Sequence, residues 1–234
     1  MLAHGSDIPR ANATVNLYLA ALAHTFTIAV KEWGWLDDSP MRKVTKPRKP
    51  RGRVRYLSDE ERQRLLEACK VSRNSSLYTV VVLALSTGAR KMEILSLRWS
   101  DVDLQCQVIT LHETKNGERR VLPLTGHALE LIAIHAKNRR TETELVFPRG
   151  TGTQPMCIRA AGEYAVKRAD IPDFRFHDLR HSAASYLAMN GASLMEIAAV
   201  LGHKTLVMVE RYAHLSEAHT AGVVARMNEK IFGQ

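Results

Sequence analysis

The segment 174–214 constrains the fold most, because its glycines and capping residues predict short helices that follow one another closely. Gly191 is typical of the left-handed residue that ends a helix. Ser193 and Glu196, three residues apart, have the pattern of a capping box, in which each side chain satisfies a backbone N–H group of the other residue. A second helix is therefore expected to begin at Ser193 and to stop at Gly202. We expect the chain to turn back at each of the two glycines.

Four polar side chains come together under that arrangement. His177, near the start of the first helix, and Arg180 share a helix face because they are three residues apart. His203 directly follows the second glycine stop. Tyr212 lies in the last turn of an expected third helix, which Thr205 can cap. One arginine, two histidines and one tyrosine around a point predict a site for an oxyanion, with phosphate as the first choice.

Each of these side chains also has a simpler explanation when it is taken alone. A tyrosine beside an apolar stripe usually packs half-buried with its hydroxyl in water, and a single arginine is usually a surface charge. A histidine after a glycine cap often hydrogen-bonds the last helix carbonyls. Two histidines can bind a metal, but their spacing does not fit a zinc pair, and no cysteine or carboxylate cluster accompanies them. Only their joint order favours a functional site.

That order resembles a known family. The motifs HDLRH (177–181), LGHK (201–204) and VERYAHLS (209–216) resemble the C-terminal motifs of the tyrosine recombinase, or phage integrase, family. The resemblance extends upstream to STGARKMEILSLRWSDVDL (86–104) and to TKNGERRVLPL (114–124). These motifs are far more specific as a set than any of them is alone.

The resemblance covers most of the chain from 58 to 215 and implies a set of site residues. The implied catalytic residues are Arg90, Lys115, His177, Arg180, His203 and the nucleophile Tyr212. Each of these positions holds a residue type that can function there, so the resemblance implies an active enzyme.

The pattern along the chain predicts a mainly α fold with a small antiparallel β-sheet (α+β), which is also the catalytic-domain fold that the resemblance implies. The expected elements are helices over 58–70, 77–87, 90–97, 126–139 and 156–169, strands within 99–104, 108–115 and 118–124, and a short apolar segment over 145–148. Ser58 and Glu61 form a second capping box. The apolar run before Gly88 contains β-branched valines that favour a strand, but the glycine stop favours a buried helix.

Two of the implied residues also have a local interpretation. Arg90 and Glu93 could be an ordinary ion pair between residues three apart, or Glu93 could fix the guanidinium so that it faces a phosphate. Asn116 and Gly117 predict a type I′ hairpin turn. Lys115, at the edge of that turn, could be a solubilising charge or could enter a DNA groove; the resemblance assigns the catalytic lysine here.

The N-terminal part predicts one long helix over 11–36, with apolar residues at three- and four-residue steps. It resembles the last part of the small helical core-binding domain that precedes the catalytic domain in the family. The resemblance implies a fragment with this organisation: 1–40, the end of a core-binding domain; 41–56, a basic interdomain linker; 57–215, the catalytic domain; and 216–234, a C-terminal exchange helix. The alternative for the first part is a simple helix that packs on the main domain.

The linker is basic and is interrupted by prolines and a glycine, so neither helix nor sheet is expected to run through it. Its candidate DNA-binding residues are Arg42, Lys43, Lys46, Arg48, Lys49, Arg51, Arg53 and Arg55. Such residues could be a solvated spacer or could displace counterions from a DNA backbone, and both roles are compatible.

Composition agrees with an anionic partner. The formal net charge is +9 and the pI is about 9.7, which points to nucleic acid before an acidic membrane. No apolar run reaches the roughly 18 residues of a membrane span, and no signal-peptide core is evident. Three scattered cysteines suggest reduced thiols in a cytoplasmic protein. No P-loop or carboxylate cluster for Mg²⁺ is present in the sequence, so no cofactor is expected.

These observations lead to one expected function and several alternatives. The expected function is a site-specific DNA recombinase that cuts and rejoins double-stranded DNA through a 3′-phosphotyrosyl intermediate, with His177 taking the Tyr212 proton and Lys115 protonating the leaving oxygen. The resemblance implies a tetramer on DNA, and we expect a monomer when the protein is free. The alternatives are a chromosome-resolution recombinase, a conjugative-transposon integrase, a non-catalytic DNA-binding module and a metal-dependent nuclease.

Overall fold

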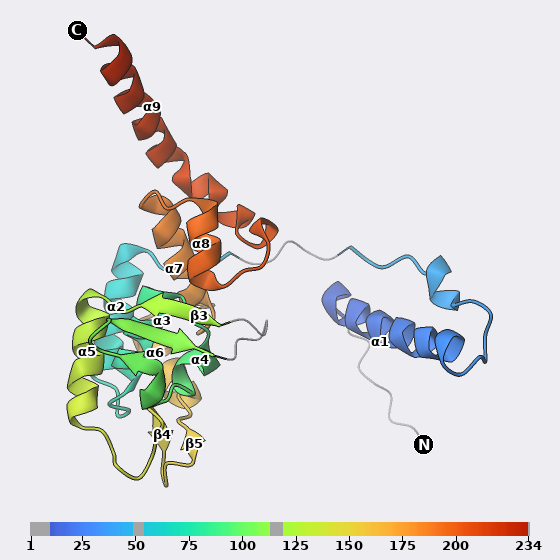
Figure 1. Ribbon diagram of the computed structural model, residues 1–234, viewed down its shortest axis with the longest axis horizontal. Coiled ribbons are helices and arrows are strands. Elements are labelled where there is room, and N and C mark those ends of the chain that lie inside the picture. Colours follow the sequence, from blue (N-terminus) through green and yellow to red (C-terminus); the bar gives the residue numbers. More distant parts are fainter. Residues whose placement is uncertain (1–9, 49–53, 113–118, 234) are drawn as a thin grey trace. The chain divides into compact units, whose positions relative to one another are not determined.

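The computed structural model describes residues 10–48, 54–112 and 119–233 (Figure 1). The chain divides into two compact units, Met1–Arg53 and Val54–Gln234. The division falls inside the stretch 41–56, which the sequence assigned to a linker.

The first unit contains the helix α1 (Asn12–Lys31) and a short 3₁₀ turn, η1 (Pro40–Lys43). The Nδ2 groups of Asn12 and Asn16 donate hydrogen bonds of 3.0 and 2.8 Å to the carbonyls of Arg48 and Pro47, so this part of the linker is held against the beginning of α1. The sequence predicted that neither helix nor sheet runs through the linker, and η1 is confined to its first residues. The first residue of η1 is a proline, whose fixed φ suits the first position of a helical turn.

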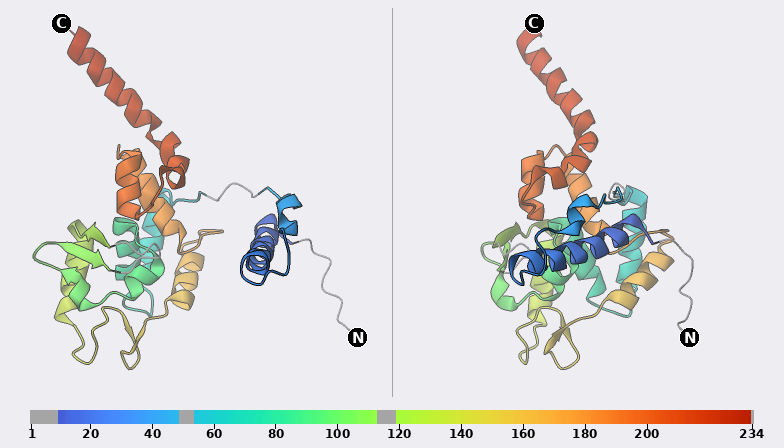
Figure 2. Two further views of the ribbon diagram at one scale, coloured as in Figure 1. Left: turned by 45° about the vertical axis from the view of Figure 1, so that its right-hand side comes forward. Right: turned by 90° about the vertical axis from the view of Figure 1, so that its right-hand side faces the viewer.

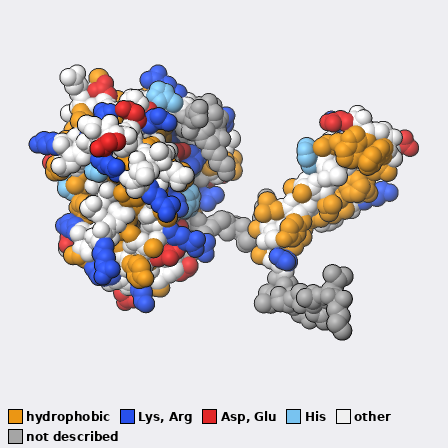
Figure 3. All heavy atoms as spheres, turned by 90° about the horizontal axis from the view of Figure 1, so that it is seen from below, with side chains coloured by type: hydrophobic (Ala, Val, Ile, Leu, Met, Phe, Trp, Pro, Cys, Tyr) orange, Lys and Arg blue, Asp and Glu red, His pale blue; other side chains and the backbone are white. Residues whose placement is uncertain are grey.

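One face of α1 is apolar and open to solvent. Leu17, Tyr18 and Leu22 are all exposed there, and apolar side chains spread over this unit in Figure 3. By length and composition alone, α1 could also cross a membrane, which corrects the expectation that no segment could. Within the described residues, nothing of the first unit covers this face.

The second unit is built around α3 (Leu77–Thr87), a helix whose side chains are almost all buried. It contacts α2 (Asp59–Lys70), α4 (Lys91–Leu95), α5 (Gly126–Lys137) and α7 (Asp178–Met189). The helix prediction for the apolar run is therefore confirmed over the strand alternative. A helix packed on several sides needs apolar residues all round, which explains why periodicity alone could not identify it.

A three-stranded antiparallel sheet lies beside these helices, in the order β1 (Val102–Asp103), β2 (Val108–Leu111) and β3 (Arg120–Pro123). A 3₁₀ turn, η2 (Trp99–Asp101), leads into it. Leu111 pairs with Arg120 at the end of the β2–β3 hairpin that leads into the connecting segment. The predicted turn at Asn116 and Gly117, and Lys115 with it, lie outside the described residues.

Smaller elements complete the second unit. The segment expected to be apolar leads into β4 (Pro148–Arg149), which pairs antiparallel with β5 (Gln154–Pro155). The helix expected from residue 156 begins later, as α6 (Arg159–Arg168), and packs on α2.

The glycine stops and capping boxes are formed as the sequence predicts. Helix α7 gives way to Gly191 at φ 86°, and α8 (Leu194–Leu201) ends at Gly202 at φ 64°. Ser193 and Glu196 make both hydrogen bonds of the capping box that opens α8, and Ser58 and Glu61 do the same for α2.

The third helix was predicted incorrectly. The chain forms two 3₁₀ turns instead, η3 (Leu206–Met208) and η4 (Glu210–Ser216), and Thr205 makes no side-chain cap. In a 3₁₀ helix, residues three apart lie on one face. Val209 and Tyr212 are three apart, and both are buried in a small apolar cluster with α7 and α8. The tighter turn therefore lets both side chains enter the core.

The C-terminal tail forms the expected helix, α9 (Glu217–Phe232). It extends away from α7 and α8 in both Figure 1 and Figure 2. Val223, Met227 and Ile231, which lie at four-residue steps, are exposed on it. The helix therefore leaves its apolar stripe uncovered by the described residues of this chain.

We expect Gly88→Ala to lower the free energy of unfolding by about 1–3 kcal/mol, because an L-residue is strained at positive φ and a new Cβ meets a neighbour. The φ of Gly88 is 62°, and a Cβ there would lie 2.6 Å from Leu201 Cδ2. Gly150→Ala is the matched control, since its φ is 45° but no atom lies within 4 Å of the added Cβ. Urea unfolding measures both variants. Equal losses would mean that the contact with Leu201 is relieved without cost.

Candidate active site

The guanidinium of Arg180 is the centre of the site and is almost fully buried, at 4% exposure. It donates hydrogen bonds to the carbonyls of Gly88, at 2.7 Å, and of Leu201. A third bond joins it to Nε2 of His203 at 2.9 Å. Burial, followed by the charges of Arg90 and Arg120, lowers the pKa of Arg180 to about 10, so the group stays cationic at neutral pH.

His203 is held as a neutral ring. Because Nε2 accepts from Arg180, we assign the ring proton to Nδ1. That nitrogen is buried and has no hydrogen-bond partner among the described residues. Burial, followed by the charge of Arg180, lowers the pKa of His203 to about 4. The ring therefore presents an unused donor, which an anionic ligand could satisfy.

Arg90 and Glu93 form the ion pair that both sequence interpretations contain, and the orientation of the guanidinium toward a phosphate stays a prediction. The Nη1 atom of Arg90 lies 2.6 Å from one carboxylate oxygen of Glu93, and the backbone N–H of Arg90 donates to the other at 2.8 Å. A second arginine, Arg120, donates to Glu93 at 2.8 Å from the neighbouring strand. Burial opposes ionisation of Glu93, but these partners outweigh it, and the pKa of Glu93 is lowered. One carboxylate thus holds two guanidinium groups.

Arg120 was not assigned by the sequence. It is only 8% exposed, and its Nε and Nη1 atoms have no partner in the described part of the chain. A Cβ at Gly202 would lie 2.7 Å from Nη1 of Arg120, so only glycine fits beside this guanidinium without displacing it. The alternating burial of β3 marks this position as facing inward, but its ion-pair partner is distant in sequence.

His177 lies at the mouth of the site. It occupies the N-cap position of α7 without a side-chain capping bond, and it lines an open recess together with Arg90 and Glu93. Burial, followed by the charge of Arg180, lowers the pKa of His177. His177 therefore faces the recess beside Arg90, whereas Arg180 is directed into the protein, toward Gly88, Leu201 and His203.

The hydroxyl of Tyr212 bonds to a residue that the sequence left without a role. Nδ1 of His181 lies 2.5 Å from the Tyr212 oxygen. The tyrosine is 2% exposed, and burial raises its pKa. The sequence assigned the Tyr212 proton to His177, whose ring instead contacts the ring of His181 edge-on, with 5.3 Å between centroids. His181 stands in the quoted HDLRH motif, which is the signal that could have identified it.

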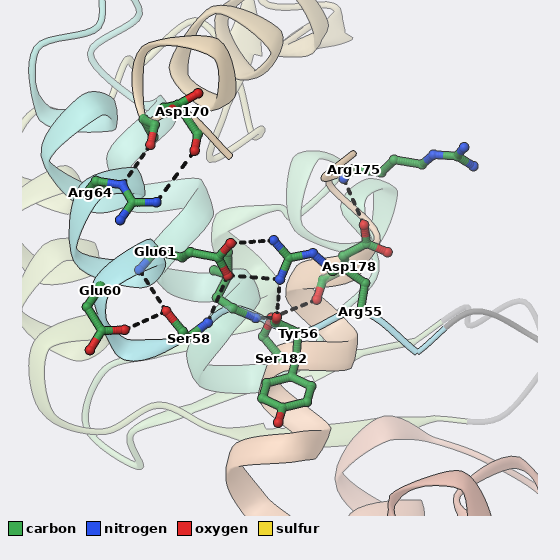
Figure 4. Close-up of polar contacts among 12 residues, drawn as sticks. Arg55, Tyr56, Ser58, Glu60, Glu61, Arg64, Asp170, Arg175, Asp178 and Ser182 are labelled. Atoms are coloured by element: carbon green, nitrogen blue, oxygen red, sulfur yellow. Dashed lines mark hydrogen bonds and ion pairs between the residues drawn. The ribbon is translucent and has the colours of Figure 1, made fainter. Parts of the chain in front are cut away.

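The last residue of the basic linker is engaged within the second unit. Figure 4 shows the fork of Arg55 directed at the carboxylate of Glu61, with N–O distances of 2.9 and 2.5 Å. Next to it, the backbone N–H of Leu57 donates to Ser182 Oγ at 3.0 Å, which fixes the chain entry against α7. A phosphate contact by Arg55 stays a prediction. It requires the guanidinium to bind a phosphate while it remains paired with Glu61.

The other linker residues are not brought to the site by any described contact. The side chain of Arg42 is 77% exposed and lies 3.1 Å from Asp38. Lys43, Lys46 and Arg48 belong to the first unit. Lys49, Arg51 and Arg53 lie outside the described residues. DNA binding by this set stays a prediction.

A family model decides the affiliation of the chain. The model of the phage integrase family matches residues 55–219. The chain belongs to the phage integrase family. The family expectation from the sequence motifs is thereby confirmed, together with the mainly α fold that carries small antiparallel sheets.

Curated relatives of this integrase-family chain include a shufflon-specific DNA recombinase of Escherichia coli. That protein is 38% identical over 208 residues, which are 88% of this chain and 52% of the relative. The integrase of Salmonella phage P22 is 33% identical over 237 residues, with 96% of this chain and 59% of the relative covered. The chain spans little more than half the length of these relatives.

Solved structures agree with this affiliation. The catalytic domain of bacteriophage HP1 integrase is 30% identical, with a TM-score of 0.59 over 78% of this chain and 99% of that domain. The Tn1549 transposon integrase, solved with a circular intermediate DNA, has a TM-score of 0.72 over 92% of this chain and 80% of its own. It is 17% identical, so it supports the fold alone.

Acidification should destabilise the protein through the site histidines. Burial lowers the pKa values of His177, His181 and His203, the last two to about 4, from 6.5 in the unfolded chain. Between those values the unfolded chain binds more protons, so stability is fully present above pH 6.5 and is lost as the pH falls toward 4. Urea unfolding between pH 7.5 and 4.5 measures the slope.

We expect His203→Gln to make that slope shallower, since one of the contributing groups is removed. His24→Gln, on the exposed surface of α1, is the control and should keep the slope of the parent. An unchanged slope in His203→Gln would show that burial does not hold this ring neutral.

Proposed function

We propose that this chain is the catalytic part of a site-specific DNA recombinase, an integrase that cuts and rejoins double-stranded DNA through a 3′-phosphotyrosyl intermediate without metal or ATP. The observation that carries the proposal is the cationic Arg180, fixed beside the unsatisfied donor of His203, with a buried tyrosine on the adjoining turn. The curated names of the relatives, a shufflon-specific recombinase and a phage integrase, support the same activity.

Phosphate recognition falls to Arg90, Arg180 and His203. Each arginine can donate N–H groups to the non-bridging oxygens, and His203 can add the unused Nδ1–H. These donors stabilise the charge that grows on the oxygens as phosphorus becomes five-coordinate. Removing one such preorganised donor typically costs about 3–4 kcal/mol of transition-state stabilisation. The network around Glu93 holds Arg90 ready before DNA arrives.

Covalent chemistry falls to Tyr212 and Lys115. The Tyr212 oxygen loses its proton and bonds to phosphorus, while the bond from phosphorus to the 5′ oxygen breaks. Lys115 gives that oxygen its proton. The phosphotyrosyl bond keeps the energy of the phosphodiester, so rejoining needs no external source. A substrate with a 5′-bridging sulfur, which leaves without a proton, should restore cleavage by Lys115→Ala; if it does not, Lys115 is no general acid.

The positive net charge supports the proposed DNA binding, and the DNA substrate supports the proposed location. The net charge of +9 and the basic linker suit a DNA backbone, where each neutralised phosphate releases counterions. We place the protein in the cytoplasm, where its DNA substrate is found. Arg42, Lys43, Lys46, Arg48 and Arg55 are the linker cations of the described part that are proposed to touch phosphates.

Assembly is proposed to run through α9. Its apolar stripe is exposed, and a helix of this length is marginal unless it buries such a stripe. A neighbouring copy on DNA is the proposed acceptor, giving a tetramer on DNA and a monomer in free solution. Because α9 follows η4 directly, docking in trans would act on the position of Tyr212.

The alternatives remain distinguishable by experiment. A chromosome-resolution recombinase or a conjugative-transposon integrase would use the same residues on different DNA targets. A non-catalytic DNA-binding module would bind DNA and form no covalent adduct. A metal-dependent nuclease would lose cleavage to a chelator, whereas the proposed enzyme would keep it.

The nucleophile is tested by Tyr212→Phe, which removes one oxygen and little packing. We expect the variant to fold and bind DNA but to form no covalent adduct with a nicked suicide substrate on a denaturing gel. Tyr186→Phe is the matched control, since Tyr186 also bonds through its hydroxyl, to the Leu57 carbonyl at 2.9 Å, but belongs to no catalytic position. Adduct at the parental level from Tyr212→Phe would disprove the assignment.

The tail is tested by deleting residues 217–234. We expect a folded monomer that still forms the covalent adduct but no longer assembles multimeric synaptic complexes in a native gel. Replacing Val223, Met227 and Ile231 together with Gln keeps the helix, removes the stripe and should give the same loss. Normal assembly by the truncated protein would mean that α9 is only a lid on its own domain and has no part in assembly.

A further inference from the structure

The tyrosine of the site has a proton to lose and almost no solvent to take it. Tyr212 is 2% exposed, and burial raises its pKa, so the ionised fraction at neutral pH is below that of a free phenol. A buried nucleophile of this kind needs a base within hydrogen-bond reach. Among the described residues, the group that meets this distance is His181, whose Nδ1 lies 2.5 Å from the hydroxyl oxygen.

We propose that His181 is the catalytic base of the reaction, accepting the Tyr212 proton at Nδ1 during cleavage and returning it during rejoining. This inference rests on the proposed function. It assigns to His181 a role that the motif-based set of six residues leaves to His177.

Both partners of this contact are held by packing. His181 follows Arg180 in α7, a helix that the Gly88 carbonyl anchors through the arginine. Tyr212 is fixed in η4, where its backbone N–H donates to the Val209 carbonyl at 2.9 Å. Helix α7 packs against η4, and the two rings lie 6.0 Å apart between centroids, tilted by 47°. The proton path is therefore built into the folded chain before DNA binds.

The protonation state fits the role. An Nδ1 that accepts from the phenol places the ring proton on Nε2 and leaves the ring neutral. The charged and titratable groups that act on His181 are His177 at the N-cap of α7, Asp178 and Arg180 within α7, and Arg211 from η4. The cations among them oppose a second proton on the ring. A bound phosphodiester brings negative charge into the same site and offsets them, so the substrate itself raises the basicity of His181.

The two histidines of the motif face different groups and therefore have different roles. His177 faces the recess that Arg90 lines, where a phosphate would lie. His181, four residues later, faces the tyrosine. Their rings meet edge-on, so His177 can support the ring of His181 without touching the nucleophile.

The proton and the electron pairs balance over one cycle. The phenol O–H bond breaks toward Nδ1, and the oxygen forms a bond to phosphorus. The bond from phosphorus to the 5′ oxygen breaks, and that oxygen takes a proton from the general acid. Rejoining runs through the same steps in reverse, with the His181 imidazolium returning its proton to the phenolate.

The test uses His181→Asn and His181→Gln in the full chain. Asparagine places its amide oxygen near the position of Nδ1, so it can hold the phenol but cannot accept the proton; glutamine reaches toward the position of Nε2 and loses the contact. We expect adduct formation on a nicked suicide substrate to fall by about 10²–10⁴-fold in both variants. Urea unfolding confirms that each variant folds.

A more acidic nucleophile separates a base from a mere support. With fluorotyrosine at position 212, whose phenol ionises more easily, His181→Asn should regain much of its lost rate, and its rate should climb with pH more steeply than that of the parent. A supporting residue would give neither effect. Should the asparagine variant be unfolded, the glutamine variant with fluorotyrosine at position 212 is measured in the same pH series and decides in the same way.

The outcomes also separate this inference from the proposed function. Adduct from the parent and an undiminished rate in His181→Asn overturn the role of His181 and leave the recombinase standing. Loss without rescue by fluorotyrosine overturns it as well. No adduct from the parent overturns both.

Discussion

The buried guanidinium of Arg180 is the interaction on which the rest of the site depends. A charge taken out of water is costly unless hydrogen bonds replace its hydration. Here the carbonyls of Gly88 and Leu201 replace it, and both stand at helix C-termini, those of α3 and α8. Helix C-termini carry partial negative charge, so two helix ends directed at one cation stabilise it. The same bonds lock together three helices that are distant in sequence.

The carboxylate of Glu93 extends this arrangement to the sheet. Two arginines at one carboxylate would repel each other if it were absent, and the pair with Arg120 is buried on both sides, at 8 and 9% side-chain exposure. Breaking a buried pair leaves an uncompensated charge, which is strongly destabilising. The strand β3 and the loop before α4 are therefore fixed relative to each other through one side chain. Positive charge is thereby concentrated around Glu93, beside the proposed phosphate position, while the carboxylate compensates it.

Sequence reasoning succeeded where the physics is local. Glycine stops and capping boxes depend on residues within one turn, so α7 and α8 could be predicted from Gly191, Ser193 and Gly202. It was wrong for the turns around Tyr212, because burial of Val209 and Tyr212 together decides their tight winding. Arg120 was missed because its partner is far away in the chain. His181 follows Arg180 by one residue, so its side chain points about 100° further around the helix. That direction leads to Tyr212 only because η4 packs there, which the sequence does not predict. The assignment of the six motif residues still rests on the resemblance; of these residues, Arg90 and His177 line one recess, and Arg180 and His203 are hydrogen-bonded to each other.

The direct joining of η4 to α9 has a mechanical consequence. Tyr212 lies four residues before Ser216, where the tight turns give way to an α-helix of 16 residues, about 24 Å long. No loop separates them, so a movement of the helix is transmitted directly to the turn that holds Tyr212, the proposed nucleophile. A displacement of several ångströms at the far end of α9 becomes a fraction of an ångström at the phenol oxygen. A large movement of the exposed end of α9 would therefore shift the Tyr212 oxygen by an amount comparable to a change in hydrogen-bond length.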